Sequence, residues 1–420
     1  MADFGIERIG DVTAGRVDAL AMATQVFDQP SLVTLAWNGS HAVHQVWDLW
    51  PDGQIHLAGE AKLPGGAEPA VATFTQSRAL SVFRDQGGPG LKHVEWRTFP
   101  GFIEVFEDAL GDSDRNPTIA MLGRGFVGRR TRSGSQGSSE ADPPSDTAQD
   151  RGPVTYVPSG TLSASLSVRR GYAVVASRRA DQKMRLAVWG LDDDSEVKIL
   201  LGKVVETVGE PALDLAVVKV REDRGADGLL TGAQVVTASR TSPGGNLRLE
   251  RWQIQLKQKQ DQPPSSITKL GEVVAPEQVT EVEATTVVAP LATTSVVTTV
   301  RLASGNLRVI GWRLGDDGSL VRWAEEDAGA VGAISCTHVR GRAVATAVKQ
   351  GDGTLKVIYW LFPSQIAGAL QRKGSASAGA IGFRVRCVHV PGVGTHLGDT
   401  VVGVSLPDGK LKLIRWRVQE

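Results

Sequence analysis

The chain has 420 residues, 41% of them hydrophobic and 22% charged, which is enough for a large core or for two ordinary domains. Lysine plus arginine and aspartate plus glutamate number 46 each, so no net field favours nucleic acid or an anionic membrane surface, and we expect neither as a partner. The two cysteines, Cys336 and Cys387, are too few for a disulfide framework.

The first fifteen residues, MADFGIERIGDVTAG, lack the basic segment and the apolar run of a secretory signal. No uninterrupted run of about 18 apolar residues follows, so the sequence predicts no membrane span. Together with the low cysteine content, these features predict a cytoplasmic protein.

One short pattern recurs seven times along the chain. Each copy has a β-branched run, a turn of Gly, Asp or Asn, and a second strand that ends in a tryptophan, as in RLASGNLRVIGW and LPDGKLKLIRW. The seven tryptophans are Trp47, Trp96, Trp189, Trp252, Trp312, Trp360 and Trp416. Several copies continue through an Asp-Gly turn into another strand, and a strand of small and branched residues precedes each hairpin. Each unit therefore has four predicted strands.

The tryptophans are 49, 93, 63, 60, 48 and 56 residues apart, and four-stranded units of this length are typical of propeller blades. The long spacing contains GRRTRSGSQGSSEADPPSDTAQDRG, which is rich in Gly, Ser, Pro and charge. Because such a segment cannot bury apolar surface, we predict a disordered loop insertion at 128–152 within a single domain that spans 1–420.

The strand LRVIGWRL is apolar on both faces near its centre. Ile310 and Trp312 lie on one face, and Leu307 and Val309 lie on the other. A sheet packed between two neighbours needs this pattern, whereas a sheet with one wet face would alternate. We therefore interpret the tryptophans as core residues and not as platforms for a ligand.

The two ends of the repeat array complement each other. The last copy stops at Glu420, just after its tryptophan strand, without the outer strand that other copies have. The segment 4–15, FGIERIGDVTAG, is similar to SSITKLGEVVAPEQ, the outer strand of another copy. We expect the N-terminal strand to complete the C-terminal unit, which would close a ring and remove its exposed edges.

These repeats resemble those of a seven-bladed β-propeller, and the resemblance covers nearly the whole chain apart from the insertion. It implies an all-β fold of seven four-stranded blades. Trp47-Asp48 is the one Trp-Asp pair, and double glycines do not recur in strand centres, so the repeats do not resemble the WD or kelch types. Asp192 to Asp194 lack the alternating spacing of integrin-like calcium loops. The resemblance is to a bacterial propeller family outside these types.

A basic residue recurs ten to twelve residues before the tryptophan, at the end of the second strand. Five of the seven equivalent positions are basic. The seven are Trp37, Arg84, Arg178, Arg240, Arg301, Lys349 and Leu406. The resemblance to propellers implies that this end shares a face with the links between blades. The first six residues are thus candidates for binding an acidic protein surface or an acidic glycan, because arginine makes bidentate contacts with carboxylates. The alternative is a solvated rim whose charges pair with nearby carboxylates.

Two C-x-H pairs, Cys336 with His338 and Cys387 with His389, occupy matching places on the innermost strands of adjacent units. Residues two apart share a strand face, so each pair has two possible metal ligands. Equivalent residues of successive blades should face different gaps, however, which favours core cysteines with hydrogen-bonded histidines. We predict no metal, and no phosphate-binding glycine loop or other cofactor motif is present.

Three functions are compatible with these features. The first is a non-catalytic scaffold that presents a loop face to a protein partner, as a subunit of a larger assembly. The second is glycan binding, which needs recurring exposed aromatic rings, yet the chain has only 3 tyrosines. The third is a hydrolase or lyase with a site at the central funnel, for which Asp18, Asp214, Glu281 and Glu283 are candidate carboxylates. They do not recur, so we predict no catalytic residue and favour the scaffold.

Overall fold

The computed structural model describes most of the chain, and all regular structure in the described residues is β-strand, which confirms the all-β prediction. The predicted insertion at 128–152 lies outside the described residues. These residues contain no helix with the length and hydropathy to cross a bilayer. The described ranges are 4–26, 30–75, 78–85, 90–99, 102–109, 115–122, 170–192, 200–226, 229–241, 245–257, 264–288, 294–364, 368–391 and 396–419.

Three four-stranded antiparallel sheets follow the order of the chain. The first contains β2 (Ala19–Val26), β3 (Pro30–Trp37), β4 (His41–Leu49) and β5 (Ile55–Pro64). The second contains β6 (Ala67–Thr75), β7 (Arg78–Arg84), β8 (Leu91–Phe99) and β9 (Phe102–Ala109). The third contains β10 (Arg115–Leu122), β11 (Arg170–Arg178), β12 (Lys183–Asp192) and β13 (Leu200–Pro211).

The fourth four-stranded sheet joins segments from opposite parts of the sequence. Its strand order is β1-β26-β25-β24, so the first strand of the chain pairs antiparallel with the last. The register places Ile6 opposite Val418 and Val12 opposite Leu413. The strands are β1 (Gly5–Arg16), β24 (Val385–Pro391), β25 (His396–Ser405) and β26 (Lys410–Gln419).

The remaining ten strands form one continuous sheet because two of them are long. β17 pairs with β16 over its first part and with β18 from Val279 onward. Likewise, β20 pairs with β19 and then, from Val331, with β21. An expected outer strand and the next inner strand are thus one element here. The ten are β14 (Leu215–Arg224), β15 (Leu230–Arg240), β16 (Asn246–Gln255), β17 (Ser266–Val288), β18 (Thr294–Leu302), β19 (Asn306–Leu314), β20 (Leu320–Arg340), β21 (Ala343–Gln350), β22 (Thr354–Leu361) and β23 (Gln371–Ala380).

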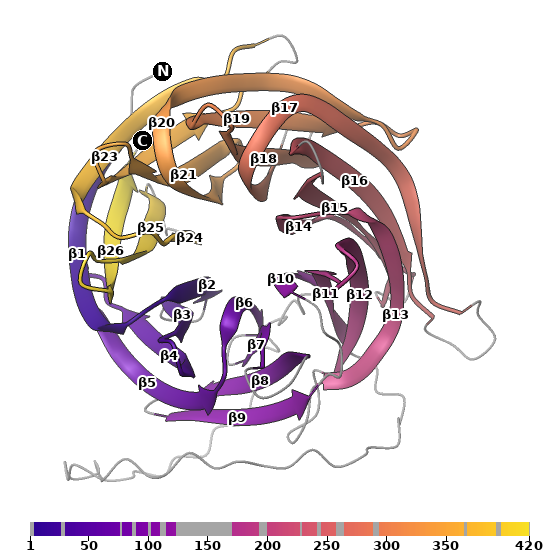
Figure 1. Cartoon of the computed structure of the whole chain (residues 1–420), viewed down its shortest axis with the longest axis horizontal. Helices are drawn as coiled ribbons and strands as arrows, with labels where there is room; N and C mark the ends of the chain where they lie inside the picture. The colour runs from indigo at the N-terminus through magenta and orange to yellow at the C-terminus, as the bar shows by residue number, and fades with distance from the viewer. Residues whose placement is uncertain are drawn as a thin grey trace, which may run out of the picture.

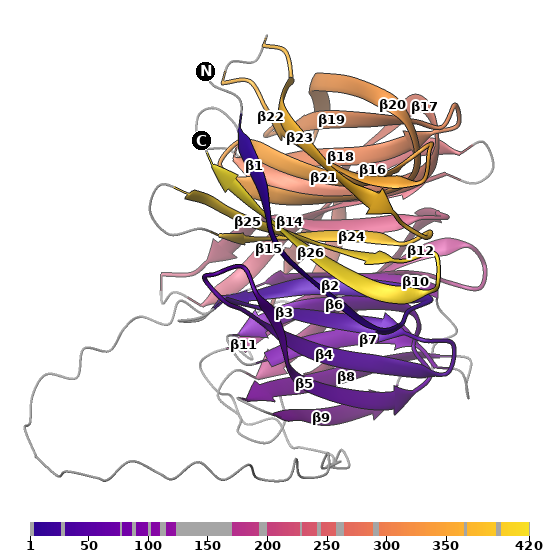
Figure 2. The same cartoon turned by 90° about the vertical axis from the view of Figure 1, so that its left-hand side faces the viewer.

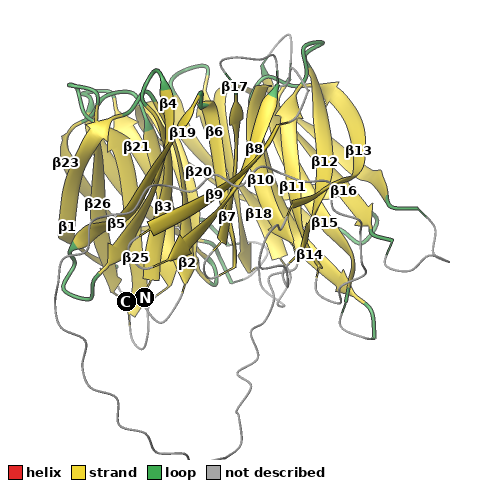
Figure 3. Ribbon diagram, turned by 90° about the horizontal axis from the view of Figure 1, so that it is seen from below, coloured by secondary structure: helices red, strands yellow, loops and turns green. Residues whose placement is uncertain are grey.

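The sheets stand around a common axis, with β2, β6, β10, β14 and β24 nearest to it and β1, β5, β9, β13 and β23 at the rim (Figure 1). This radial arrangement of antiparallel sheets is that of a β-propeller. Seen from the side, the strands run between the two faces of the disc (Figures 2 and 3). Each inner strand therefore has one end at each face, close to the axis.

The hydrophobic core lies between neighbouring sheets. Leu35 of β3 belongs to the same buried cluster as Phe83 of β7 and Trp96 of β8. Trp47 of β4 shares a cluster with Leu413 of β26. Because each sheet buries both faces against its neighbours, the stability of the disc comes from stacking the sheets and not from any one sheet alone.

The recurrent tryptophans are core residues, as predicted. They are Trp47, Trp96, Trp189, Trp252, Trp312, Trp360 and Trp416, and none is more than 5% exposed. In four of the seven the indole Nε1–H donates to a buried threonine of the neighbouring strand, at 2.8–3.0 Å. The acceptors are Thr34, Thr237, Thr298 and Thr346. A buried indole is thereby satisfied without any contribution from a ligand.

Two junctions between neighbouring sheets are built in the same way. Gly10 of β1 lies against the backbone of Gly53, in the turn between β4 and β5. Gly271 of β17 lies against Gly318, in the turn between β19 and β20. In both cases a Cβ would collide with a carbonyl group, so the strand and the turn approach closely only because glycine is present.

An arginine accompanies each of these glycine contacts. Arg415 of β26 donates from Nη1 to the carbonyl oxygen of Trp50, and Arg251 of β16 donates from Nη1 to that of Gly315, both at 2.5 Å. Each arginine directly precedes the tryptophan of its strand. The junction between the β1 sheet and the β2 sheet therefore has the same two contacts as the junction, inside the ten-stranded sheet, at which β16 and β17 meet the turn between β19 and β20.

Candidate functional site

The turns between second and third strands lie beside the links that lead to the next inner strand. Four link residues donate a backbone N–H to the carbonyl oxygen of a turn glycine at 2.6–2.9 Å. The pairs are Val17 with Gly409, Val279 with Gly245, Val331 with Gly305, and Ile381 with Gly353. We call this side of the disc the link face. The ends of the second strands belong to it, as the resemblance implied.

The six predicted binding residues all lie at this face, at or next to the ends of β3, β7, β11, β15, β18 and β21. They are Trp37, Arg84, Arg178, Arg240, Arg301 and Lys349, and each is half-buried. The apolar seventh position, Leu406, directly follows β25. None of the six side chains therefore extends fully into solvent.

Two of the basic residues are held by neighbouring groups. Arg240 Nε lies 3.0 Å from Asp214 Oδ2. Arg301 donates from Nε to Thr280 Oγ1 at 2.8 Å and from Nη1 to the carbonyl oxygen of Gly332 at 2.6 Å. The Arg240 pair fits the alternative of a rim paired with carboxylates. A partner-binding role for the basic set stays a prediction.

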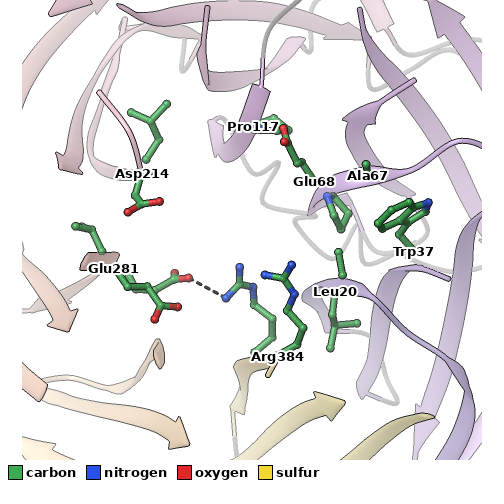
Figure 4. A pocket seen from close by; sticks show the side chains of 14 residues that line it. Leu20, Trp37, Ala67, Glu68, Pro117, Asp214, Glu281 and Arg384 are labelled. Atoms are coloured by element: carbon green, nitrogen blue, oxygen red, sulfur yellow. Dashed lines mark ion pairs between the residues drawn. The ribbon is translucent and has the colours of Figure 1, made fainter. Parts of the chain in front are cut away.

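A cavity of about 470 Å³ lies on the link face, where the inner strands begin (Figure 4). Of the six predicted residues only Trp37 lines it. Asp214 and Glu281, two carboxylates considered for a central-funnel site, point into it from one side, and Arg384 faces them (Figure 4). The charged lining is completed by Glu68, Glu283 and Arg386.

Four of the six charged lining residues occupy equivalent places relative to their inner strands. In each unit the recurrent tryptophan pairs with a residue of the second strand, and that residue pairs with one of the inner strand. Each of the four charged residues lies five positions before this inner-strand residue. These residues are Glu68, Asp214, Glu281 and Arg384. The sequence analysis considered Asp214 and Glu281 and missed Glu68 and Arg384. Aligning the inner strands by their distance from the tryptophan would have found the position.

One wall of the cavity is acidic. Glu281 and Glu283 are two residues apart on β17 and share a face, and Asp214 directly precedes β14. Burial raises the pKa of Glu281 to about 7, and the charge of Glu283 adds to this effect. Burial also raises the pKa of Glu283 and of Asp214, while Arg386 and Arg240 respectively oppose these shifts.

The facing wall is basic. Arg386 of β24 pairs through Nη1 with Glu283 Oε1 at 3.0 Å and so connects two inner strands that have β20 between them. Arg384 donates from Nε to the carbonyl oxygen of Asp18 at 3.0 Å. Burial, with the nearby charge of Arg386, lowers the pKa of Arg384. Among the described residues, neither Arg384 nor Glu281 forms an ion pair.

Three of the four residues of the C-x-H pairs are buried, and His338 is half-buried. Cys336 and Cys387 are 9% and 5% exposed and belong to different inter-sheet clusters, as equivalent residues of neighbouring blades should. Burial raises the pKa of Cys387 to about 12 and that of Cys336 well above its usual range, so both stay thiols. His338 and His389 each place Nε2 at 3.0 Å from a backbone carbonyl oxygen. No group of three potential metal ligands occurs in the described part of the chain.

Exposed aromatic side chains do not recur from sheet to sheet in the described ranges. Trp50 is 48% exposed in the turn after β4, and Phe383 is 60% exposed before β24. These two positions are not equivalent, so they do not form the repeated platforms that multivalent glycan binding needs. Glycan binding stays a prediction.

Comparisons with known proteins return distant structural likenesses. No family model matches the sequence, and no curated protein is detectably similar to it. A protein of the COPII outer coat vertex on membranes shares 12% identity and a TM-score of 0.48, over 96% of this chain and 84% of that one. A mutant of the Aleuria aurantia lectin in complex with Fucα1-6GlcNAc shares 8% identity and a TM-score of 0.45, over 84% of this chain and 94% of that one. The WD40 domain of SCAP from fission yeast shares 9% identity and a TM-score of 0.43, over 99% of this chain and 87% of that one. No function is carried over from these proteins.

Proposed function

We propose that this chain is a seven-bladed propeller, closed into a ring by β1, that acts as a non-catalytic binding module for a protein partner. Its recognition site is the charged cavity at the centre of the link face. The long strands β17 and β20 each serve two blades in this reading, so the ten-stranded sheet counts as three blades beside the four separate sheets.

The pattern of buried clusters supports seven blades. Seven hydrophobic clusters occur in the described residues, and each draws on two neighbouring sheets or parts of the ten-stranded sheet. A closed ring of seven blades has seven such gaps. One of these clusters joins β2–β5 to β24–β26, which is the gap that closure would create.

The construction of that gap supports closure by β1. Val17 donates to Gly409 as the other link residues donate to their turn glycines. Gly10 and Arg415 also repeat the contacts of Gly271 and Arg251. A terminal strand added at random would have no reason to reproduce all three contacts. Closing the ring in this way covers the edge of β26.

One observation carries the binding function: ionisable side chains from several sheets converge on a single polar cavity. A volume of about 470 Å³ is within the range of small-molecule and peptide-segment sites. Burying Glu281, Glu283 and Arg384 near like charges costs stability, and no contact of the core requires these charges. Residues that are costly to the fold and converge in a cavity indicate a site.

Selection from a random-peptide display library on the immobilised protein tests this function. We expect recovered peptides to lose binding to the Glu281→Gln/Glu283→Gln variant and to keep it on Arg340→Gln, which changes an exposed residue at the end of β20 on the opposite face. Circular dichroism and thermal melting check that the variants fold. Peptides that bind all proteins equally, or no enrichment at all, would contradict the proposal.

A second candidate is acid–base catalysis in the same cavity, as in a hydrolase or lyase. It is favoured by Glu281, because a carboxyl group with a pKa of about 7 can both donate and accept a proton at neutral pH. A turnover screen with chromogenic glycosides and uronides separates the two functions. Activity that Glu281→Gln abolishes would establish catalysis and replace the binding-module proposal.

A further inference from the structure

Five of the six charged residues that line the central cavity form two groups of opposite sign, and the sixth, Glu68 of β6, lies apart from the acidic group (Figure 4). Asp214, Glu281 and Glu283 come from the beginnings of two inner strands, whereas Arg384 and Arg386 come from the beginning of β24 (Figure 4). A uniformly acidic or basic ring would suit a ligand of one charge. Two facing walls of opposite sign create a field across the cavity, which suits a ligand that carries both charges.

Ion pairs within the protein neutralise only some of the charged residues of each wall. Asp214 pairs with Arg240, and Glu283 pairs with Arg386. Glu281 and Arg384 are the members without an ion pair among the described residues. The charge of Glu281 partly opposes the lowering of the pKa of Arg384 by burial, so Arg384 feels the charge of Glu281 across the cavity. One acidic and one basic group are thus left facing each other from opposite walls.

Each wall also contains like charges in close proximity. Glu281 and Glu283 share one strand face, and the charge of one opposes ionisation of the other. Arg384 and Arg386 are likewise two residues apart, and the charge of Arg386 lowers the pKa of Arg384. A cation placed at the first pair and an anion placed at the second would relieve both repulsions at once. A ligand of a single charge would relieve one and worsen the contacts of the other.

We propose that the central cavity binds a partner segment that presents a basic and an acidic side chain next to each other. The basic group lies against Glu281 and Glu283, and the acidic group lies against Arg384. This inference rests on the proposed binding function and adds the chemistry of its ligand. Trp37 and Leu20, on the far side of the arginines, supply apolar surface for the stems of such side chains (Figure 4).

Fluorescence anisotropy with three labelled alanine-based peptides tests the ligand class. One peptide alternates lysine and glutamate, one has only lysine, and one has only glutamate, at equal length and with capped ends. At low salt we expect the mixed peptide to bind at least about tenfold more tightly than either other, because each wall needs its own counter-charge. Free lysine and glutamate added together, as competitors, test whether a free amino acid is the ligand instead.

Matched variants locate the binding. Glu281→Gln/Glu283→Gln and Arg384→Gln should each weaken binding of the mixed peptide by at least about tenfold, because each removes one wall's charge. Glu7→Gln and Arg340→Gln, at exposed positions outside the cavity, should leave it unchanged. Equal affinity for a single-sign peptide, no binding of any designed peptide, displacement by free amino acids, or indifference to Arg384→Gln would each overturn the inference.

The peptide library distinguishes this failure from failure of the binding function. If the library yields cavity-dependent peptides without paired charges, the proposed ligand class is wrong while the binding function stands. If the library yields none and the designed peptides do not bind, both are wrong.

Discussion

Replacing Gly10 by alanine tests the closure of the ring most directly. An ideal Cβ on Gly10 would lie 2.9 Å from the carbonyl carbon of Gly53 and closer still to its oxygen. Carbon atoms in contact are about 3.5–4.0 Å apart, so the strand and the turn would have to separate by at least about 0.6–1.1 Å. Gly10 does not have a positive φ, so alanine lacks only space and not a permitted backbone conformation.

The cost follows from the rigidity of both partners. Overpacking against backbone atoms costs about 1–3 kcal/mol, and β1 pairs with one strand only, so it can detach while the rest of its sheet stays paired. A loss of about 2 kcal/mol corresponds to about a thirtyfold larger population of the state in which β1 is detached. Gly15→Ala is the matched control, because a Cβ at Gly15 meets nothing within 4 Å.

Hydrogen–deuterium exchange measures the result. In Gly10→Ala the amides of β1 and β26 should exchange faster, with the other strands little changed, whereas Gly15→Ala should exchange like the wild type. Gly271→Ala creates a similar collision, with the Cβ 3.0 Å from the carbonyl carbon of Gly318, but in a strand that continues on both sides. It should lower the melting temperature without releasing a strand. Unchanged exchange of β1 in Gly10→Ala would refute the packing argument.

Three further predictions concern buried polar groups. Thr298→Val should lower the free energy of unfolding by about 1–3 kcal/mol in denaturant titration, since it leaves the Nε1–H of Trp312 without its acceptor, whereas Thr298→Ser should cost less. Arg415→Met should lower the free energy of unfolding by about 3–5 kcal/mol, because it removes a partner of the buried Asp399. A loss no larger than that caused by the same substitution at an exposed arginine would contradict this. The pKa of Glu281 is raised from 4.5 to about 7, so ionising it opposes folding, and stability should fall as pH rises through this window. Glu281→Gln should flatten that fall in urea titrations at several pH values.

The strand content and the radial stacking were predictable because they depend on local patterns. The tryptophan copies each carry their own turn and two apolar faces, and Trp312 is buried as that pattern requires. The predicted similarity of segment 4–15 to SSITKLGEVVAPEQ also places Gly10 and Gly271 at the same position of RIGDV and KLGEV, and both glycines make the same backbone contact. Continuous strands such as β17 were not foreseen, since a strand that bends from one sheet into the next has no turn signal to mark the change.

The central cavity was only half predictable. Glu281 and Glu283 were recognised as possible site residues, but their partner Arg386 is more than a hundred positions away and belongs to another sheet. Basic residues recur at the ends of the second strands and therefore stand out in the sequence, but those side chains lie mostly outside the cavity. A ring brings unlike residues together at its centre, so a search for repeated residues overlooks a site made of different ones.

The pairing of β1 with β26 also sets an order of events during synthesis. The ribosome makes β1 first, and its partner emerges almost 400 residues later. At about 5–20 residues per second, the strand waits about 20–80 seconds with its hydrogen-bonding edges open. Glu7, Arg8 and Asp11 keep this waiting strand charged, which disfavours pairing with another nascent chain. In the proposed ring, the blade that β1 completes is therefore also the last to form, because closure waits for β26.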